Sequence, residues 1–315
     1  MFPNDIVSIV FLYLEQKDAV KTAKLFPGKK WKVTFSVGCA DYDRLSNTFV
    51  ITKVYDWDSH NVPNDLIYLG FDDDFNQPLN GATLPKNLVS LEFGNKFNQP
   101  LDGVKLPDNL VDIGFGYDFN QPLDKVKLPN SIIYLGFGND FNQPLDNVKL
   151  PDNLADLIFG DRFNQPLDNV KLPDGIGYLD FGFDFNQPLD NVKLPNTLSH
   201  LLFSGNFNQS LDKVEFPNAI VHLEFGRYFN QQLGDAKLPN SLVYLEFGDR
   251  FNQPLNGVKL PDNLTHLGFG YNFDQPLDNV TFPDSLRYLK FGVKFNHPLD
   301  DVVLPPGVRI IRPIS

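Results

Sequence analysis

The pentapeptide Phe97-Asn98-Gln99-Pro100-Leu101 (FNQPL) decides the fold, because it returns at a fixed interval along the chain. FNQPL or a close variant of it begins at Phe75, Phe97, Phe119, Phe141, Phe163, Phe185, Phe207, Phe229, Phe251, Phe273 and Phe295. Each copy starts 22 residues after the one before it, with no insertion. A constant period of roughly 20–50 residues predicts a solenoid in which each repeat forms one coil.

A single repeat shows which element the coil contributes. The period from Leu106 to Lys127 reads LPDNLVDIGFGYDFNQPLDKVK, and its general form is L-P-x-x-L-x-x-L-x-F-G-x-x-F-N-Q-P-L-x-x-V-x. The segment L-x-x-L-x-F predicts a short strand, and the Gly after it predicts a turn that a Cβ would hinder. Pro and Gly interrupt both halves of the period, so no full α-helix fits. We expect a mostly β solenoid with one strand per repeat and a back of extended segments and turns.

Two Phe residues per repeat predict the interior of the coil. Eleven Phe begin the FNQPL copies and eleven more lie four residues earlier, which accounts for 22 of the 30 Phe residues. Coils stacked at equal intervals would align them as two continuous columns. Each buried aromatic side chain contributes roughly a few kcal/mol, and neighbouring rings add a little more. Core packing explains these columns better than a cofactor site does.

The Asn of FNQPL has a different predicted role. An amide side chain both donates and accepts hydrogen bonds, so a repeated Asn can bond backbone groups of its own coil and of the next one. Asp274 replaces this Asn in one copy. Because a carboxylate cannot donate, we expect that coil to lose part of its bonding, about 1–3 kcal/mol if the site is buried.

Composition narrows the classes of function. The single cysteine, Cys39, excludes a disulfide framework and fits a reducing compartment. No apolar run approaches the roughly 18–20 residues of a membrane helix, so we expect a cytoplasmic protein. The net charge is −12, and the first forty residues carry +3, so the remainder carries −15. An acidic array argues against nucleic acid as the partner, because phosphates bind cationic groups.

The pattern L-x-x-L-x-F followed by FNQPL resembles the FNIP repeat, a 22-residue relative of the leucine-rich repeat. The resemblance covers about residues 63–304, which hold eleven repeats. It implies a curved, right-handed coil with a parallel sheet on its inner face.

The outermost coils of a stack need caps. Residues 41–62 resemble one degenerate coil, because Phe49 lies 22 residues before Phe71 and Trp57 lies 22 residues before Leu79. At the other end, residues 305–315 predict a capping strand in which Ile311 takes the second apolar position. Pro313 then discourages further pairing.

Residues 1–40 predict a short helical head of a different kind. Its apolar residues have helical spacing, and their order resembles an F-box, which implies docking on a Skp-type linker through Pro3, Ile6, Ile9, Val10 and Leu14. Lys17-Asp18 and Trp31 also match in order. Phe2 departs from the usual Leu, and Pro27-Gly28 interrupts the third helix, so a plain solenoid cap stays open as the alternative. The combination of an F-box-like head with FNIP repeats resembles proteins of giant viruses that infect amoebae.

The strand pattern also predicts a binding surface. The third and fifth positions of L-x-x-L-x-F should face the open inner side of the coil. The third position is rich in Tyr and His, and the fifth leans acidic; the residues singled out are Tyr68, Asp112, Tyr134, Asp156, Tyr178, Asp180, His200, His222, Glu224, Tyr244, Glu246, His266 and Tyr288. Tyr and His present an apolar body with a polar tip, which is common at protein interfaces. The predicted partner is a protein with a basic, partly apolar face, although the rings could simply stack on one another.

Catalysis has no support in the sequence. It contains no G-x-S-x-G, H-E-x-x-H or G-x-x-x-x-G-K motif. A metal held by His200, His222 and Glu224 is a weak third hypothesis, and we expect no cofactor. The favoured function is an adaptor of a cullin ubiquitin ligase, with the head on the linker and the target on the coil. The alternative is a non-enzymatic repeat scaffold without a ubiquitin link.

Overall fold

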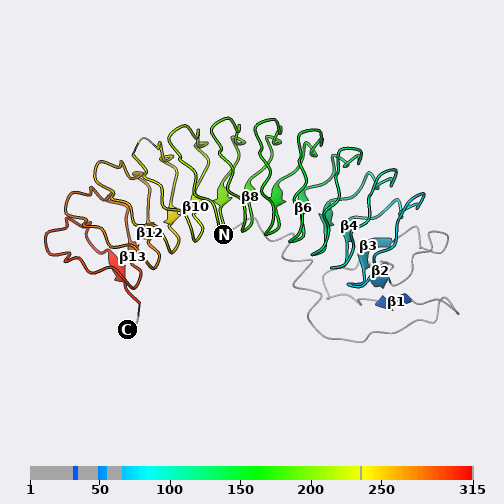
Figure 1. Ribbon diagram of the computed structural model, residues 1–315, viewed down its shortest axis with the longest axis horizontal. Coiled ribbons are helices and arrows are strands. Elements are labelled where there is room, and N and C mark those ends of the chain that lie inside the picture. The colour runs from blue at the N-terminus through cyan, green and yellow to red at the C-terminus, as the bar shows by residue number, and fades with distance from the viewer. Residues whose placement is uncertain (1–30, 35–48, 55–65, 235, 314–315) are drawn as a thin grey trace, which may run out of the picture.

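The protein is a curved parallel β-solenoid (Figure 1). The computed structural model describes residues 31–34, 49–54, 66–234 and 236–313. In this part of the chain all regular elements are strands, and fourteen of them form one sheet in chain order from β1 to β14. The predicted helices of the head lie outside the described residues, as do its docking residues.

The strands after β3 are short and evenly placed. The sheet consists of β1 (Trp31–Thr34), β2 (Phe49–Val54), β3 (Leu66–Phe71), β4 (Ser90–Glu92), β5 (Asp112–Gly114), β6 (Tyr134–Gly136), β7 (Asp156–Ile158), β8 (Tyr178–Asp180), β9 (His200–Leu202), β10 (His222–Glu224), β11 (Tyr244–Glu246), β12 (His266–Gly268), β13 (Tyr288–Lys290) and β14 (Arg309–Ile311). From β3 to β13 each strand pairs in parallel with the next at a register of one 22-residue period, as in Tyr68 with Ser90. One strand in each of the eleven predicted repeats is therefore confirmed.

The two Phe columns fill the interior as predicted. Phe93, which follows β4, and Phe97, which begins FNQPL, are both buried, and their ring centroids lie 4.3 Å apart. The same pair recurs in the next coil, where Phe115 and Phe119 stack at 4.1 Å. Leu and Val side chains of the repeat surround both columns in one continuous core. The aromatic repetition therefore serves packing.

The spacing of these columns explains why the solenoid curves. Paired strands lie about 4.8 Å apart. Ring centroids in the column that follows the strands are 5.3–6.1 Å apart from coil to coil. In the FNQPL column the same spacing is 6.0–6.2 Å. Coils that separate with distance from the sheet must bend toward it, so the strands lie on the inner side of the arch, as Figure 1 shows.

The Gly that follows most of the repeat strands permits close approach of neighbouring coils, whereas Asp72 and Ser204 stand at this position in two coils. A Cβ at Gly116 would lie 2.0 Å from the carbonyl oxygen of Gly94, and a Cβ at Gly138 would lie 1.7 Å from that of Gly116. The turn itself rarely needs a left-handed backbone at this position, since only Gly182 of this column has a positive φ. The Gly column therefore lets the coil backbones touch.

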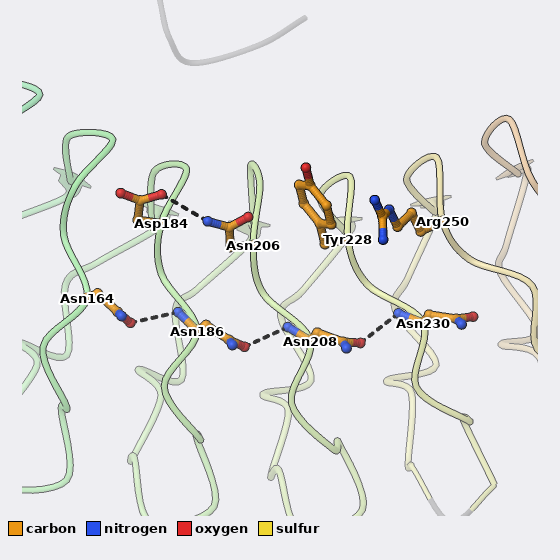
Figure 2. Close-up of a pocket in the computed structure, with 8 residues that line it drawn as sticks. All are labelled: Asn164, Asp184, Asn186, Asn206, Asn208, Tyr228, Asn230 and Arg250. Atoms are coloured by element: carbon orange, nitrogen blue, oxygen red, sulfur yellow. Dashed lines mark hydrogen bonds between the residues drawn. The ribbon is translucent and has the colours of Figure 1, made fainter.

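The Asn of FNQPL forms a continuous ladder, shown in part in Figure 2. The Oδ1 of each ladder residue accepts the backbone N–H of the ladder residue in the next coil, for example Asn208 N to Asn186 Oδ1 at 2.9 Å. Gln209 Nε2 of that next coil donates to the same oxygen at 3.0 Å. The predicted bond to the next coil is confirmed. The asparagine ladder comprises Asn76, Asn98, Asn120, Asn142, Asn164, Asn186, Asn208, Asn230, Asn252, Asp274 and Asn296.

The predicted loss of bonding at Asp274 is wrong. The ladder uses the side-chain oxygen as an acceptor, which a carboxylate supplies as well as an amide does. Asp274 Oδ1 accepts the N–H of Asn296 at 3.0 Å, within the range of the Asn rungs. His297 replaces the usual Gln in the next coil, and its Nε2 lies 3.2 Å from the Asp274 carbonyl oxygen and 3.5 Å from Oδ1.

The N-terminal end of the sheet differs from the predicted coil. Phe49 pairs with Leu66, and Val54 pairs with Phe71, so the predicted correspondence of Phe49 with Phe71 is wrong. The run FVITKV forms a strand of six residues, which pairs with β3 through two register shifts and does not keep the 22-residue period. Strand β1 then pairs antiparallel with β2, on the edge of β2 that faces away from β3. Trp31, placed in the head by the F-box resemblance, therefore begins an edge strand of the solenoid.

The C-terminal strand is also shifted by one residue. Ile310 pairs with Leu289, and Ile311 pairs with Lys290, so the prediction that Ile311 takes the second apolar position is wrong. The last coil has one residue fewer than the period between these paired positions. Both isoleucines stay exposed, because no coil follows them in the described chain.

Candidate functional site: the concave face

The concave face is built from three positions of each L-x-x-L-x-F strand segment. Leu at the first and fourth positions and Phe at the sixth point into the core and are buried. The third and fifth positions alternate with the buried fourth position and therefore point to the inner side of the arch, and most residues at the second, third and fifth positions are exposed at least in part. Residues that share a position lie on neighbouring strands in register, so they form the second-, third- and fifth-position columns. This arrangement brings together all predicted concave-face residues.

The third-position column is a row of neighbouring aromatic rings from β8 to β13, stacked at every step except the tilted Tyr244–His266 contact. His200 and His222 lie with ring centroids 5.4 Å apart, and His222 and Tyr244 lie almost parallel at 4.3 Å. Tyr178 extends the stack at one end, 6.0 Å from His200. The other end continues through His266 to Tyr288, with spacings of 5.8 and 4.4 Å. Each ring is partly exposed, so the column presents ring edges and polar tips to the inner surface.

Acidic residues of the fifth-position column flank this stack. His222 Nε2 lies 3.5 Å from Glu224 Oε2, and this contact with His222 lowers the pKa of Glu224. Glu246 pairs in register with Glu224 on the next strand. Like charges directly opposite one another repel, and Lys290 offsets this by placing its Nζ 2.7 Å from Glu246 Oε1. The other Glu246 oxygen accepts the Tyr244 hydroxyl at 3.1 Å.

Two glycines of the fifth-position column make room for neighbouring side chains. A Cβ at Gly268 would lie 1.9 Å from Glu246 Oε2, so the Glu246 carboxylate occupies the space above this glycine. A Cβ at Gly136 would lie 2.9 Å from the Tyr134 hydroxyl, whose ring covers Gly136 in the same way. Variation in the fifth position therefore shapes the surface as well as its charge.

The N-terminal half of the face carries carboxyl groups with raised pKa values. Burial raises the pKa of Asp112 to about 6, helped by the charge of Glu92 and opposed by the Ser90 hydroxyl, which donates to Asp112 Oδ2 at 3.1 Å. Burial also raises the pKa of Tyr134 to about 12, with Asp112 as the next cause. Tyr68 donates its hydroxyl to Glu92. Burial likewise raises the pKa of Asp156 and of Asp180.

In the C-terminal half of the face, the pKa of one histidine is lowered. Burial lowers the pKa of His200, and the neighbouring His222 adds to this. Burial raises the pKa of Tyr244 to about 12, with the Glu246 charge as the second cause. His200 is therefore protonated less readily than an exposed imidazole.

The second-position column was not predicted from the sequence. Val89, Ile133 and Val243 occupy it with 40%, 41% and 37% of their surface exposed. They lie directly before the third-position residues and leave apolar groups exposed beside them. Their signal was present, because β-branched residues recur at this position, but the prediction had assigned only the third and fifth positions to the surface.

A cavity of about 420 Å³ opens where the fifth-position column meets the turns of β10–β13. Its lining includes Glu224, Glu246 and Lys290 from the strands, and Arg227, Tyr271 and Val293 from the turns. This hollow joins carboxylates to aromatic and apolar surface.

Metal chemistry finds no support in the residues that the structure describes. They contain no group of three or more His, Cys, Asp or Glu side chains that could hold a metal ion. Within the same residues, none of the segments is a helix long and apolar enough to cross a membrane.

The fold and its inner face define a leucine-rich-repeat-like solenoid of the kind that serves protein interaction. The FNIP Repeat matches residues 59–96, 97–140, 141–184, 163–206, 185–213, 207–250 and 251–294, so the chain belongs to the FNIP repeat family. The resemblance of the 22-residue repeats to the FNIP repeat is thereby confirmed. No curated protein matches the chain significantly.

Two solved structures place the fold among known ones. CroV588, described as a novel circular LRR protein and coming from a giant virus, is 47% identical with a TM-score of 0.73 over 80% of this chain. The chain spans 37% of the length of that protein. An internalin (inlF) from Listeria monocytogenes is 12% identical with a TM-score of 0.53, and the match covers 85% of this chain and 86% of that one. At this identity the internalin supports the fold alone.

Proposed function

We propose that the chain is a protein-binding module whose concave face holds a partner with a basic, partly apolar surface. One observation carries this proposal: a row of neighbouring, partly exposed Tyr and His rings runs beside carboxylates on one rigid sheet. Aromatic side chains supply large contact area at low entropic cost. The carboxylates Glu224 and Glu246 would meet cationic side chains of the partner, and the second-position column would cover its apolar groups.

The sheet contributes preorganisation. The residues of each column are fixed by register and by buried Leu and Phe on either side, so little side-chain freedom is lost on binding. A partner with complementary charge would also be steered toward this acidic face. The module would contribute proximity and no chemistry of its own.

A phage-displayed library of random 12-residue peptides, selected on the full chain, tests this function. Selected peptides should combine Lys or Arg with aromatic or aliphatic residues. The Tyr244→Ala and Glu246→Gln variants should each weaken their binding about tenfold, which is typical of central contacts. Tyr117→Ala, which removes an exposed ring away from the face, is the matched control. Peptides without basic residues, or binding that ignores both concave variants, would contradict the proposal.

We further propose, on the order of motif residues in the sequence, that the head makes this module an adaptor. Pro3, Ile6, Ile9, Val10 and Leu14 would dock on a Skp-type linker of a cullin ubiquitin ligase in the cytoplasm, and the concave face would recruit the target. Capture of a purified Skp-type protein by the wild-type chain, lost in Ile9→Asp and kept in Val303→Asp, would support the adaptor.

The second candidate is a non-enzymatic scaffold whose N-terminal segment is a cap. The pairing of β1 with β2 favours it, because residues within the predicted head take part in closing the sheet edge. Failure of the wild-type chain to capture the Skp-type protein, while peptide binding to the concave face persists, would select this scaffold.

A further inference from the structure

A groove separate from the concave face runs beside the asparagine ladder. A cavity of about 490 Å³ is lined by four ladder residues on one side and by turn residues on the other, as Figure 2 shows. The ladder side comprises Asn164, Asn186, Asn208 and Asn230, and the turn side comprises Asp184, Asn206, Tyr228 and Arg250. A further cavity of about 480 Å³ shares Asn230 and Arg250 and extends the groove to Lys294. None of these residues belongs to the columns of the concave face.

The ladder side of the groove offers a row of hydrogen-bond donors. The Oδ1 of Asn186 is occupied by two donors from the next coil. Its Nδ2, like those of Asn164, Asn208 and Asn230, donates to no acceptor within the described residues. None of these four nitrogens is among the buried unpaired atoms there, so they reach the surface. Each coil therefore presents one accessible amide donor at the same place.

The turn side of the groove carries the cations Arg250 and Lys294 together with the carboxylate Asp184. Arg250 lies over the Tyr228 ring, with its guanidinium carbon 4.5 Å from the ring centroid, and Lys294 lies 5.6 Å from the Tyr271 centroid. Neither forms an ion pair with a carboxylate of the described chain, whereas Arg162 at the same position of another coil pairs with Asp140 at 3.3 Å. Of the groove carboxylates, Asp184 accepts a bond from Asn206, and Asp274 accepts the N–H of Asn296.

The spacing of the donors fits an extended peptide. Coils repeat every 6.0–6.2 Å at the FNQPL Phe that precedes each ladder residue. An extended chain rises about 3.2–3.4 Å per residue, so carbonyl groups on one side recur about every 6.4–6.8 Å. The carbonyl groups of alternate peptide residues would therefore match the Nδ2 atoms of successive coils, and the match would hold over several coils. Acidic side chains of the same segment would meet Arg250 and Lys294.

We propose that this groove binds an extended, acidic peptide segment of a partner protein. Backbone carbonyls of the segment accept from the ladder amides, and its carboxylates pair with the two groove cations. The site is separate from the concave face and selects the opposite charge, so one molecule can hold two different partner surfaces.

Fluorescence polarisation of a labelled, capped peptide (Glu-Ser)6 with the full chain tests the charge pairing. The peptide should bind, and Arg250→Glu should weaken it at least about tenfold, as expected for lost charge-assisted hydrogen bonds. Arg162→Glu places the same change at the same turn position outside the groove and should alter the affinity less than about twofold. The peptide (Lys-Ser)6 should not compete.

The substitution Asn208→Asp tests the ladder contact while keeping the fold. Asp274 shows that a carboxylate sustains the ladder, so this variant should melt like the wild type. It removes one donor and adds a repelling charge in the groove, so (Glu-Ser)6 should bind at least about fivefold more weakly. Asn98→Asp makes the same change on the ladder outside the groove and should have no such effect.

Several results would overturn the proposal. The first is that (Glu-Ser)6 does not bind the chain. The second is that Arg162→Glu and Arg250→Glu lower its affinity equally. The third is that Tyr244→Ala on the concave face lowers its affinity while the groove variants bind it like the wild type. Binding of polygalacturonate without binding of the peptide would show a carbohydrate site instead. The Tyr244→Ala arm also separates failure of this site from failure of the concave-face function.

Discussion

The interior and the concave face use the same repeat in opposite ways. Inside, Phe stacks on Phe in every coil from Phe71 to Phe295, and nearly every ring is buried. On the concave face the spacing between strands is equally regular, yet the third position changes from Asp112 to Tyr134 to His200. Each core position accepts one type of side chain, because it must pack against the coils on both sides. A partly solvated position on the concave face accepts many types. The constancy of the two Phe columns therefore reflects packing, which does not constrain the third position of the concave face.

The largest expected effect separates these regions with the same substitution. Phe185→Ala removes a ring that is 1% exposed and should lower the free energy of unfolding by about 3–5 kcal/mol, since it leaves a cavity. Phe183→Ala, two residues earlier and 40% exposed, should cost less than about 1 kcal/mol. Denaturant unfolding of the two variants measures both values. Equal losses would mean that the exposed turn is as tightly packed as the core.

A smaller effect is expected from two glycines of one coil. Gly116→Ala would place a Cβ 2.0 Å from the Gly94 carbonyl oxygen and should destabilise by about 1–3 kcal/mol or more. Gly114→Ala on the concave face meets only the Glu92 Cγ at 3.9 Å and should stay within about 0.5 kcal/mol. Thermal unfolding of both variants checks this. A stable Gly116→Ala variant would show that the coils can separate without penalty.

The smallest effect concerns charge on the concave face and depends on pH. The folded pKa of Asp112, about 6, exceeds its reference value of 3.8, so the neutral form is favoured in the folded chain. Its contribution to stability is complete below about pH 3.8 and is lost as pH rises through about 6. Asp112→Asn keeps an acceptor for Ser90 without the charge.

This variant should therefore match the wild type at pH 4 and exceed its stability by about 1 kcal/mol at pH 8, with solvent screening reducing the effect. Unfolding midpoints at the two pH values measure the difference. Asp108→Asn, on an exposed turn of the same coil, is the control and should show the same difference at both pH values. A larger gain at pH 4 than at pH 8 would reverse the assigned cause.

The sequence alone supported much of this fold because one period fixes the partners of every coil. The 22-residue interval placed Tyr68 beside Ser90, buried both Phe columns and assigned the third and fifth positions to one face. It missed the second-position column, since a β-branched residue next to a buried Leu is typical of either side of a strand. It also misjudged Asp274, because which atom of the Asn forms the ladder depends on where the next coil places its N–H.

The two ends were the least predictable part. Phe49 and Ile311 keep the period in the sequence, yet β2 and β14 pair at other registers. A coil inside the stack has a coil of the same 22-residue length on each side, which holds its register. Strand β2 pairs instead with the antiparallel β1 on one side, and no strand pairs beyond β14 in the described chain, so neither is held to the period.

By itself, the sequence determined that this protein stacks its coils in register around two columns of Phe, because burial of repeated aromatic side chains leaves one solution for the whole array. Only the tertiary structure decided why the stack bends toward its sheet, why Gly follows most of the repeat strands and which groups line the groove beside the asparagine ladder. Those features depend on distances between coils, and no period along the chain contains them.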